Sequence, residues 1–475
     1  MKRTVNFTKT KIIGTIGPVS ADIGILEGLL NAGIDVLRLN FSHGDHEFHA
    51  QTLKNIEAAT VSSGIPVAVL ADLCGPKIRL GDLESEIPVE KGEELIITTD
   101  EIIGTRDRVP TIYKELAADV SAGDSILIDD GLIQLEVLSS SANEVRCEVK
   151  IGGVLKSRKG INLPGVQVSA SAITEKDKRD LEFIITQQID FIALSFVRSA
   201  DDIKELRWFL KDRGKPLPIV AKIEKPEAVR DIDGIIDEAD VIMVARGDLG
   251  VEMPAEEVPL LQKMIIQKCN ARATPVITAT QMLESMVQNA RPTRAEASDV
   301  ANAVFDGTDA VMLSAETSIG AYPEKAVKIM DKIVCTADSH ARPKPASFFN
   351  RDSGELSDAE NVCRAACIMA EEASAAGIIV ITKTGRTAVL LSKYRTGIPI
   401  IAFTESEETL RFMNILWGVQ GELIQDVAET DATLRKARQL ALKLGYVHRG
   451  DKVVYVTGIP LIESTSTNMI KIETI

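Results

Sequence analysis

The segment IVAKIEKPEA places a lysine and a glutamate two residues apart at the end of an apolar run. If this run forms a strand, Lys222 and Glu224 point to the same face, because side chains alternate along a strand. The two groups could form a structural ion pair. They could also do chemistry, with Glu224 holding a divalent cation and Lys222 neutralising a group in transfer. The spacing alone leaves both interpretations open.

A further carboxylate stands in ARGDLGVE, where Asp248 lies between two glycines. Gly247 would let backbone N–H groups approach an anion, and the N-terminus of a following helix would favour negative charge there. Asp248 could then be a second ligand of the cation. The alternative is a glycine-rich turn in which Asp248 only caps a helix.

Polar side chains also follow the other apolar runs of the sequence. If the runs are strands of one closed sheet, these groups meet at one rim. A cavity with several Arg and Lys beside two or three carboxylates suits a metal-bridged, multiply anionic substrate. The residues are Arg38, Asn40, Ser42, His43, Asp72, Lys77, Arg79, Ser195, Arg198, Arg246, Thr280, Gln281, Ser314 and Glu316.

The sequence lacks the common motifs for zinc and for nucleotides. The string SHGDHEFH is not HExxH, because position 50 is Ala, and it predicts a helix capped by Asp45 that carries exposed histidines. His43 differs, since at the rim it could touch a substrate. Gly214 and Lys215 are followed by Pro, so the chain has no Walker A loop, and it has no GxGxxG fingerprint.

The segment IIVITKTGRTAV contains a second candidate phosphate pocket. Hydroxyls, a glycine and two cations stand there between a predicted strand and a predicted helix, where backbone N–H groups bind anions. A capped turn is an equally good interpretation. The residues are Thr382, Lys383, Thr384, Gly385, Arg386 and Thr387.

Eight apolar runs have to position these groups. Runs of this length suit parallel strands that are covered on both faces, and amphipathic helical stretches lie between several of them. Eight such units predict a closed (β/α)8 TIM barrel, although periodicity does not exclude an open doubly wound sheet. The runs are residues 12–16, 35–39, 67–71, 191–195, 219–223, 241–245, 276–280 and 310–314.

The spacing of these runs breaks once, and the pattern restarts after the last of them. Residues 76–170 carry β-rich patterns, which predict an all-β lid domain inserted into a βα loop. A linker rich in Pro and Ser precedes residues 346–475, which have the pattern of an open α/β domain. The barrel would then comprise residues 1–75 and 171–345. No internal sequence repeat is evident.

Composition narrows the class of protein. The chain has 475 residues and a net charge of −15, which predicts about three globular domains and argues against nucleic acid or an anionic membrane as the partner. No apolar run reaches the ~20 residues that span a bilayer, and no signal sequence is evident, so we expect a soluble, cytoplasmic chain. Cys363 and Cys367, one helical turn apart and without further ligands nearby, are predicted to be buried thiols.

Several motifs, taken in order, closely resemble those of the pyruvate kinase family. They are LRLNFSHG, GPKIRLG, KGINLPG, IVAKIEKPEA, VARGDLGVE, ATQMLESM, RPTRAEASDVANAV and DAVMLSAET, and the resemblance covers essentially the whole chain. It implies phosphoryl transfer from phosphoenolpyruvate to ADP, giving pyruvate and ATP in the last step of glycolysis. It also implies a (β/α)8 barrel with a β-barrel lid after the third strand and a C-terminal α/β effector domain.

The resemblance also implies roles for individual residues. Lys222 would stabilise the phosphoryl group in transfer, while Glu224 and Asp248 would hold Mg²⁺ or Mn²⁺. The backbone at Gly247 and Asp248 would bind the substrate carboxylate. Thr280 would orient protonation of the enolate through a water molecule.

Phosphate and nucleotide contacts follow from the same resemblance. Arg38 and Arg79 resemble the phosphate-binding arginines of the family. Lys159, in the lid motif KGINLPG, resembles a contact to the nucleotide phosphates, and we expect Asn40 and His43 beside the nucleotide.

The chain departs from the family pattern after the third apolar run. Many members read Asp-Thr-Lys-Gly-Pro-Glu-Ile-Arg there and hold a potassium ion with Asn, Ser, Asp and Thr. Asn40, Ser42 and Asp72 are present in this chain, but Leu73 has no side-chain oxygen and Lys77 replaces a carboxylate. Because a fixed ammonium could do the ion's electrostatic work, we expect activity that does not require K⁺.

The family resemblance further implies a homotetramer and a phosphorylated effector, a sugar phosphate or a nucleotide, at residues 382–387. Two other functions stay open. One is another metal-dependent (β/α)8 enzyme acting on a 2-oxo acid or its enol, which would not need the lid or Lys222. The other is an inactive binding protein that keeps the fold, which would be expected to have lost some of the site residues that this chain retains.

Overall fold

The computed structural model describes residues 8–166, 168–341, 356–427, 429–461 and 466–475. At its centre lies a closed barrel of parallel strands in the order β1-β16-β15-β14-β13-β12-β3-β2. The eight predicted runs therefore form a (β/α)8 barrel, and the doubly wound alternative is wrong. The strands are β1 (Lys11–Ile16), β2 (Val36–Asn40), β3 (Ala68–Asp72), β12 (Phe191–Leu194), β13 (Ile219–Ile223), β14 (Val241–Ala245), β15 (Val276–Ala279) and β16 (Ala310–Leu313).

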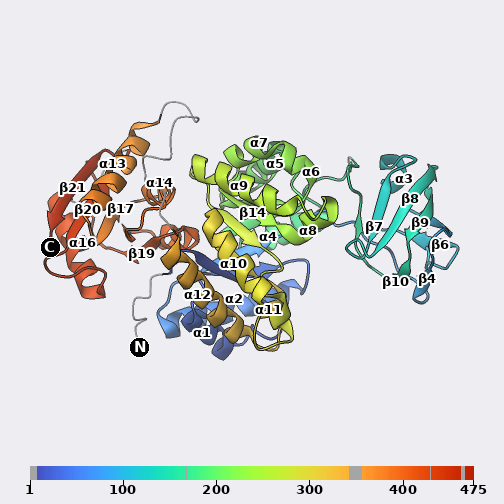
Figure 1. Ribbon diagram of the computed structural model, residues 1–475, viewed down its shortest axis with the longest axis horizontal. Coiled ribbons are helices and arrows are strands. Elements are labelled where there is room, and N and C mark those ends of the chain that lie inside the picture. Colours follow the sequence, from blue (N-terminus) through green and yellow to red (C-terminus); the bar gives the residue numbers. More distant parts are fainter. Residues whose placement is uncertain (1–7, 167, 342–355, 428, 462–465) are drawn as a thin grey trace.

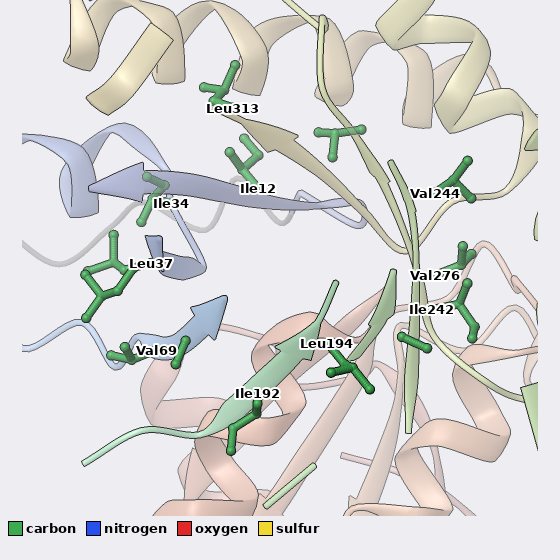
Figure 2. Packing of buried hydrophobic residues seen from close by; sticks show 14 of the residues in the cluster. Ile12, Ile34, Leu37, Val69, Ile192, Leu194, Ile242, Val244, Val276 and Leu313 are labelled. Atoms are coloured by element: carbon green, nitrogen blue, oxygen red, sulfur yellow. The ribbon is translucent and has the colours of Figure 1, made fainter. Parts of the chain in front are cut away.

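Helices follow the strands and cover the outer surface of the barrel (Figure 1). The long ones are α1 (Ile23–Ala32), α2 (His46–Ser63), α4 (Glu175–Ile184), α5 (Ala200–Asp212), α9 (Val258–Arg272), α10 (Arg294–Asp306) and α12 (Pro323–His340). Shorter ones are α6 (Pro226–Arg230), α7 (Ile232–Glu238), α8 (Arg246–Glu252), η1 (Glu284–Val287) and α11 (Ala315–Ser318). Figure 2 shows outward-pointing residues such as Ile12, Ile192 and Val244, which belong to the core between strands and helices. Burial on both faces explains why the strands read as continuous apolar runs.

The insertion after β3 forms the lid, at one end of the molecule (Figure 1). Its strands make a six-stranded sheet in the order β11-β7-β8-β9-β5-β6 and a two-stranded sheet of β10 and β4, with a short helix α3 that the all-β prediction did not include. The elements are β4 (Ile87–Val89), β5 (Glu94–Thr98), β6 (Arg108–Pro110), α3 (Leu116–Asp119), β7 (Ser125–Ile128), β8 (Ile133–Ser140), β9 (Glu144–Ile151), β10 (Gly153–Leu155) and β11 (Ile161–Asn162).

The C-terminal domain is an α/β sheet in the order β19-β18-β17-β20-β21, parallel except for β21. The predicted linker falls mostly on residues 342–355, which lie outside the described residues. The elements are α13 (Asp358–Glu372), β17 (Gly377–Ile381), α14 (Arg386–Ser392), β18 (Ile400–Thr404), α15 (Glu407–Phe412), η3 (Met413–Ile415), β19 (Val419–Leu423), α16 (Thr430–Leu444), β20 (Lys452–Thr457) and β21 (Met469–Thr474). Both cysteines of α13 are buried and free, as predicted.

An aspartate stands directly before every second strand of the barrel, at its N-terminal end. Each one accepts a backbone hydrogen bond from the neighbouring strand and so fixes the register at that end. The bonds are Ile12 N to Asp35 (2.9 Å), Val69 N to Asp190 (2.8 Å), Ile219 N to Asp240 (2.9 Å) and Val276 N to Asp309 (2.9 Å). These aspartates recur in the structure at unequal spacings along the chain, so they are not an internal sequence repeat.

The C-terminal domain docks on this same end of the barrel. Arg395 donates to Asp309 at 2.8 Å, and Arg411 donates to Asp190 at 2.7 Å. The rings of Phe191 and Phe412 lie 5.8 Å apart, within an apolar cluster that joins the barrel interior to the C-terminal domain. The lid and the C-terminal domain therefore lie at opposite ends of the barrel (Figure 1).

The histidine-rich segment is only partly as predicted. Asp45 caps α2 by accepting a hydrogen bond from the backbone N–H of Phe48 at 2.8 Å. His49, however, is buried and stacks on Phe41 with ring centroids 4.2 Å apart. The expectation of exposed histidines is therefore wrong for His49, because its ring lies on the face of α2 that packs toward the core.

Among the described residues, no helix is long and apolar enough to cross a membrane.

Candidate active site

Lys222 lies at the centre of a buried charge cluster near the C-terminal end of β13. Its ammonium donates to the hydroxyl of Ser195 at 2.7 Å and lies 2.9 Å from Glu224 and 3.3 Å from Asp72. Burial disfavours the charged amine, but the carboxylates of Asp72 and Glu224 outweigh burial and raise the pKa of Lys222. The raised pKa favours the protonated, charged form of Lys222.

Glu224 is fully buried and only partly satisfied. Its Oε2 accepts a hydrogen bond from the backbone N–H of Phe196 at 2.7 Å. Its Oε1 lies 2.9 Å from the Lys222 ammonium but accepts no hydrogen bond of good geometry from the described residues. Burial, together with the charge of Asp248, raises the pKa of Glu224 against the opposing effect of Lys222. A buried carboxylate oxygen with spare acceptor capacity beside a second carboxylate fits a divalent cation, which prefers oxygen ligands.

Asp248 lies in the first turn of α8, at the end of β14. The helix is capped by Ala245 without a side-chain hydrogen bond, so Asp248 is not its cap and that alternative is wrong. The Asp248 side chain is one-third exposed, at 33%, and faces the rim. Among the described residues no group of three or more His, Cys, Asp or Glu is gathered, so a cation here would take other ligands from substrate and water.

Thr280 is joined to the start of α8. Its hydroxyl accepts a hydrogen bond from the backbone N–H of Gly247 at 2.8 Å and donates to the carbonyl of Ala279 at 2.6 Å. Thr280 has a φ of 68°, a left-handed conformation that is strained for a β-branched residue. Such strain persists only where the surroundings impose it, and it turns this hydroxyl toward the rim of the barrel.

Asp72 orients the first rim arginine. Arg38 donates from Nε to Asp72 at 2.6 Å and from its guanidinium to Thr15 at 2.9 Å. Although burial alone would favour the neutral acid, Lys222 and Arg38 lower the pKa of Asp72. Asp72 is thus an ionised carboxylate between two cations.

The residues that stand at the position of the family's potassium site also lie at this rim. Lys77 Nζ is 4.0 Å from the nearer oxygen of Asp248, and the Asn40 side chain accepts a hydrogen bond from Ser42 N at 3.0 Å. Leu73 is 1% exposed and packs into the core.

Cations gather between the rim and the lid. His43 is exposed, and its pKa is lowered by partial desolvation and by the charges of Arg79, Lys77 and Arg38. Arg79 donates to the carbonyl of residue 158 at 3.1 Å. Lys159 projects from the lid and pairs with Asp129 at 2.8 Å.

The second candidate pocket forms a tight turn between β17 and α14. Gly385 caps α14 with a φ of 80°, and its N–H donates to the hydroxyl of Thr382 at 3.0 Å. Thr387 is hydrogen-bonded to Thr467 at 2.8 Å. Lys383, Thr384 and Arg386 are exposed. The structure thus brings these residues together in one turn, with Thr382, Gly385 and Thr387 buried and the other three exposed.

Three residues of the site were not predicted. Thr15 supports Arg38, Phe196 donates its N–H to Glu224, and Glu252 pairs with Lys225. Phe196 adopts a φ of 54°, which no sequence pattern signals for an aromatic residue. Glu252 could be found only by knowing which segments the lid and barrel bring together.

Comparisons with known proteins identify the family of this chain. Residues 7–327 match the family described as pyruvate kinase, barrel domain, and residues 360–473 match pyruvate kinase, alpha/beta domain. The chain belongs to the pyruvate kinase family. It is therefore an enzyme of the phosphotransferase class, from a family that uses a divalent metal.

Relatives in the pyruvate kinase family match this chain along nearly its full length. A pyruvate kinase of Geobacillus stearothermophilus is 46% identical over 471 residues, which is 98% of this chain and 80% of the relative. One of Corynebacterium efficiens is 44% identical over 465 residues, with 98% and 97% covered. A solved pyruvate kinase structure from Cryptosporidium parvum superposes with a TM-score of 0.94 at 39% identity, covering 98% of this chain and 96% of that one.

Proposed function

We propose that this chain transfers the phosphoryl group of phosphoenolpyruvate to ADP, giving pyruvate and ATP. The observation that carries the proposal is the buried ammonium of Lys222, held protonated at the rim between Asp72 and Glu224. Phosphoryl transfer places charge on the oxygens of the group in transfer, and a fixed positive group there stabilises the transition state.

The two rim carboxylates would hold the metal. Glu224 and Asp248 would bind Mg²⁺ or Mn²⁺, which when bound neutralises substrate oxygens. The backbone at Gly247 and Asp248, at the N-terminal end of α8, would bind the substrate carboxylate. The hydroxyl of Thr280, fixed by Gly247 N–H, would orient a water that delivers a proton to C3 of the enolate.

The phosphates would be held from the barrel and from the lid. Arg38 and Arg79 would contact the phosphoryl group and the nucleotide, and Lys159 would reach the nucleotide from the lid. Asn40 and His43 would line the nucleotide side. In this proposal residues 76–170 close over the barrel of residues 1–75 and 171–345, and closure excludes water from the transfer.

Substitution of Lys222 tests the mechanism. In Lys222→Met we expect kcat for pyruvate formation to fall by about 10²–10³-fold, the usual loss when one transition-state donor is removed. Lys204→Met is a matched control, since Lys204 is exposed and, within the described part of the chain, forms its ion pair with Asp201 on its own helix. A Lys222→Met protein that is folded by circular dichroism and loses less than about tenfold would contradict the proposed role.

We also propose that turnover does not require K⁺. Three observations support this. Both oxygens of Asp72 form ion pairs, one with Arg38 and the other with Lys222. Leu73 is buried in the core, and the Lys77 ammonium lies beside Asp248. The Lys77 ammonium would take the place of a monovalent cation and repel one, while the second oxygen of Asp248 stays free for the divalent metal. Rates should change little when KCl replaces tetramethylammonium chloride at equal ionic strength. A rise of about tenfold or more would refute this part of the proposal.

The C-terminal turn at residues 382–387 is proposed as the site of a phosphorylated effector, in a cytoplasmic homotetramer. The support is the exposure of Lys383 and Arg386 beside the N-terminus of α14. We expect glucose 6-phosphate or AMP, used as probes, to change the KM for phosphoenolpyruvate, and Arg386→Ala to remove that change. Arg435→Ala, an exposed arginine of the same domain, is the control. A response retained in Arg386→Ala would exclude this site.

A further inference from the structure

Glu252 is a buried carboxylate outside the set of residues that the proposed mechanism uses. It is the last residue of α8, the helix that begins beside Gly247 and Asp248, and its side chain is 1% exposed. Its Oε1 accepts from Lys225 Nζ at 2.5 Å and from the side-chain amide of Asn162 at 2.9 Å. Among the described residues its Oε2 has no hydrogen-bond partner. Because burying a carboxylate is costly, its place between these two donors needs an explanation.

The two donors come from different domains. Lys225 directly follows Glu224 and is the cap of α6, and its ammonium also lies 6.0 Å from the centre of the Phe196 ring. Phe196 in turn holds Glu224 through its backbone N–H at 2.7 Å. The contact with Lys225 therefore connects Glu252 to the segment that carries Glu224, one of the proposed metal ligands. The helix of Glu252 itself carries the other proposed ligand, Asp248.

The lid side of Glu252 leads to the proposed nucleotide contact. Asn162 lies on β11, which pairs with β7, and Lys159 precedes it by three residues on the same segment. Ile161 N also donates to the carbonyl of Ile78, so this segment is tied to the chain that enters the lid. The hydrogen bond from Asn162 to Glu252 is thus a link between β11 and the catalytic helix of the barrel.

We propose that Glu252 is a positioning residue that seats the lid on the barrel through Asn162, and that this contact sets the distance between Lys159 and the metal ligands. The inference rests on the proposed kinase function, because it gives the position of the lid a role in binding ADP. Lys225 neutralises the carboxylate, which makes its burial tolerable. The hydrogen bond from Asn162 to Glu252 is then the interaction that depends on the position of the lid.

Two substitutions separate this role from a merely structural one. Asn162→Ala removes only the lid donor and leaves the buried Glu252–Lys225 pair intact, so stability should change little. We expect kcat/KM for ADP to fall about tenfold, the effect of losing one charge-assisted hydrogen bond, while KM for phosphoenolpyruvate changes less than about twofold. Glu252→Gln keeps an oxygen that can accept from Asn162 but removes the charge that strengthens this bond, so kcat/KM for ADP should again fall more than that for phosphoenolpyruvate. In the double variant the two losses should not multiply, because both substitutions weaken the same hydrogen bond.

Arg146→Ala is the matched control, since it removes an exposed ion pair with Glu94 on the lid sheet. An Asn162→Ala protein with kcat/KM for ADP within about twofold of the unmodified chain, or losses that multiply fully with those of Glu252→Gln, would overturn the proposal. Equal losses for ADP and phosphoenolpyruvate would overturn it too.

Lid seating can also be measured without catalysis. Backbone amides of residues 160–166 should exchange hydrogen faster in Asn162→Ala than in the unmodified chain, because this segment would open more often. Unchanged exchange there would refute the seating contact. If the kinase proposal itself fails, the unmodified chain will form no pyruvate. The exchange measurement does not require activity, so the two failures can be told apart.

Discussion

Several polar groups at the rim are oriented by a hydrogen bond from or to a neighbour. Asp72 aligns Arg38 and Lys222, Phe196 N–H aligns Glu224, and Gly247 N–H aligns Thr280. The buried charges are paired, which keeps Lys222 protonated and Asp72 ionised. Such fixed, desolvated charges are worth more to a transition state than the same groups in water.

Lys77 allows a test of the monovalent-cation argument at a single residue. Lys77→Glu would place a carboxylate near Asp248, where the ammonium now lies 4.0 Å away. We expect turnover to fall without added salt and to be restored by KCl but not by tetramethylammonium chloride, because a bound ion would replace the lost charge. Turnover that ignores KCl in this variant would show that Lys77 does not act in place of an ion.

His49 gives the fold a dependence on pH. Its ring stacks on Phe41, and one nitrogen is hydrogen-bonded to the carbonyl of His43 at 3.0 Å. Burial lowers the pKa of His49, so the unfolded chain binds its proton more readily than the folded one. This contribution to stability is complete above the unfolded pKa of about 6.5 and is lost as pH falls through the lower folded pKa.

The comparison that isolates this effect is with His49→Phe, which keeps an aromatic ring on Phe41 but cannot titrate. Between about pH 7.5 and about pH 5.5, the urea midpoint of the unmodified chain should fall further than that of the variant. Parallel midpoints across this range would exclude His49 as the titrating group.

At the scale of elements, the aspartates before alternate strands link neighbouring strands of the barrel, and two of them, Asp190 and Asp309, also bind the C-terminal domain. Asp309 accepts from Val276 N at 2.9 Å and from Arg395 at 2.8 Å, and that ion pair is buried. Asp240 makes the equivalent strand contact, but its partner Arg207 is 41% exposed. The two aspartates thus differ mainly in their partners, because Asp309 neutralises the buried Arg395, whereas Asp240 pairs with the exposed Arg207.

Asparagine at each position separates the two roles. Asp309→Asn should lower the stability of the protein by about 3–5 kcal/mol, because it leaves the buried Arg395 uncompensated. Asp240→Asn should cost less than about 1 kcal/mol, as expected for an exposed pair. Urea unfolding followed by circular dichroism measures both. Equal losses would mean that the strand contact, and not docking of the C-terminal domain, is what Asp309 provides.

Elements were easier to predict than contacts. The eight apolar runs specify the barrel because each strand is buried on both faces. The aspartates before β2, β12, β14 and β16 are visible in the sequence, but their meaning depends on which strands are neighbours. β21 was not predicted, since its pattern of partly exposed residues is not that of a buried strand.

The site was predicted unevenly for the same reason. Residues that follow the strands, such as Lys222 and Asp248, are brought to the rim by the fold itself. Glu252 and Asn162 are ninety positions apart and meet only because the lid returns to the barrel. His49 was misplaced because the exposed and buried faces of α2 are weakly distinguished, with polar residues on both.

At the scale of the whole molecule, the barrel separates two kinds of surface. Its C-terminal rim carries the charge cluster and meets the lid, whereas its N-terminal end is closed by the C-terminal domain (Figure 1). Strand β12 runs between the two ends, from Asp190, which pairs with Arg411, to Ser195 beside Lys222.

The central claim is that this rim transfers a phosphoryl group with the help of a divalent cation held by Glu224 and Asp248. The most direct test is to follow pyruvate and ATP formed from phosphoenolpyruvate and ADP by the purified chain with Mg²⁺, and then with EDTA in excess. The account predicts equal amounts of pyruvate and ATP with Mg²⁺ and none with EDTA, restored when Mg²⁺ is returned. Pyruvate without ATP, or turnover that survives EDTA, would contradict it.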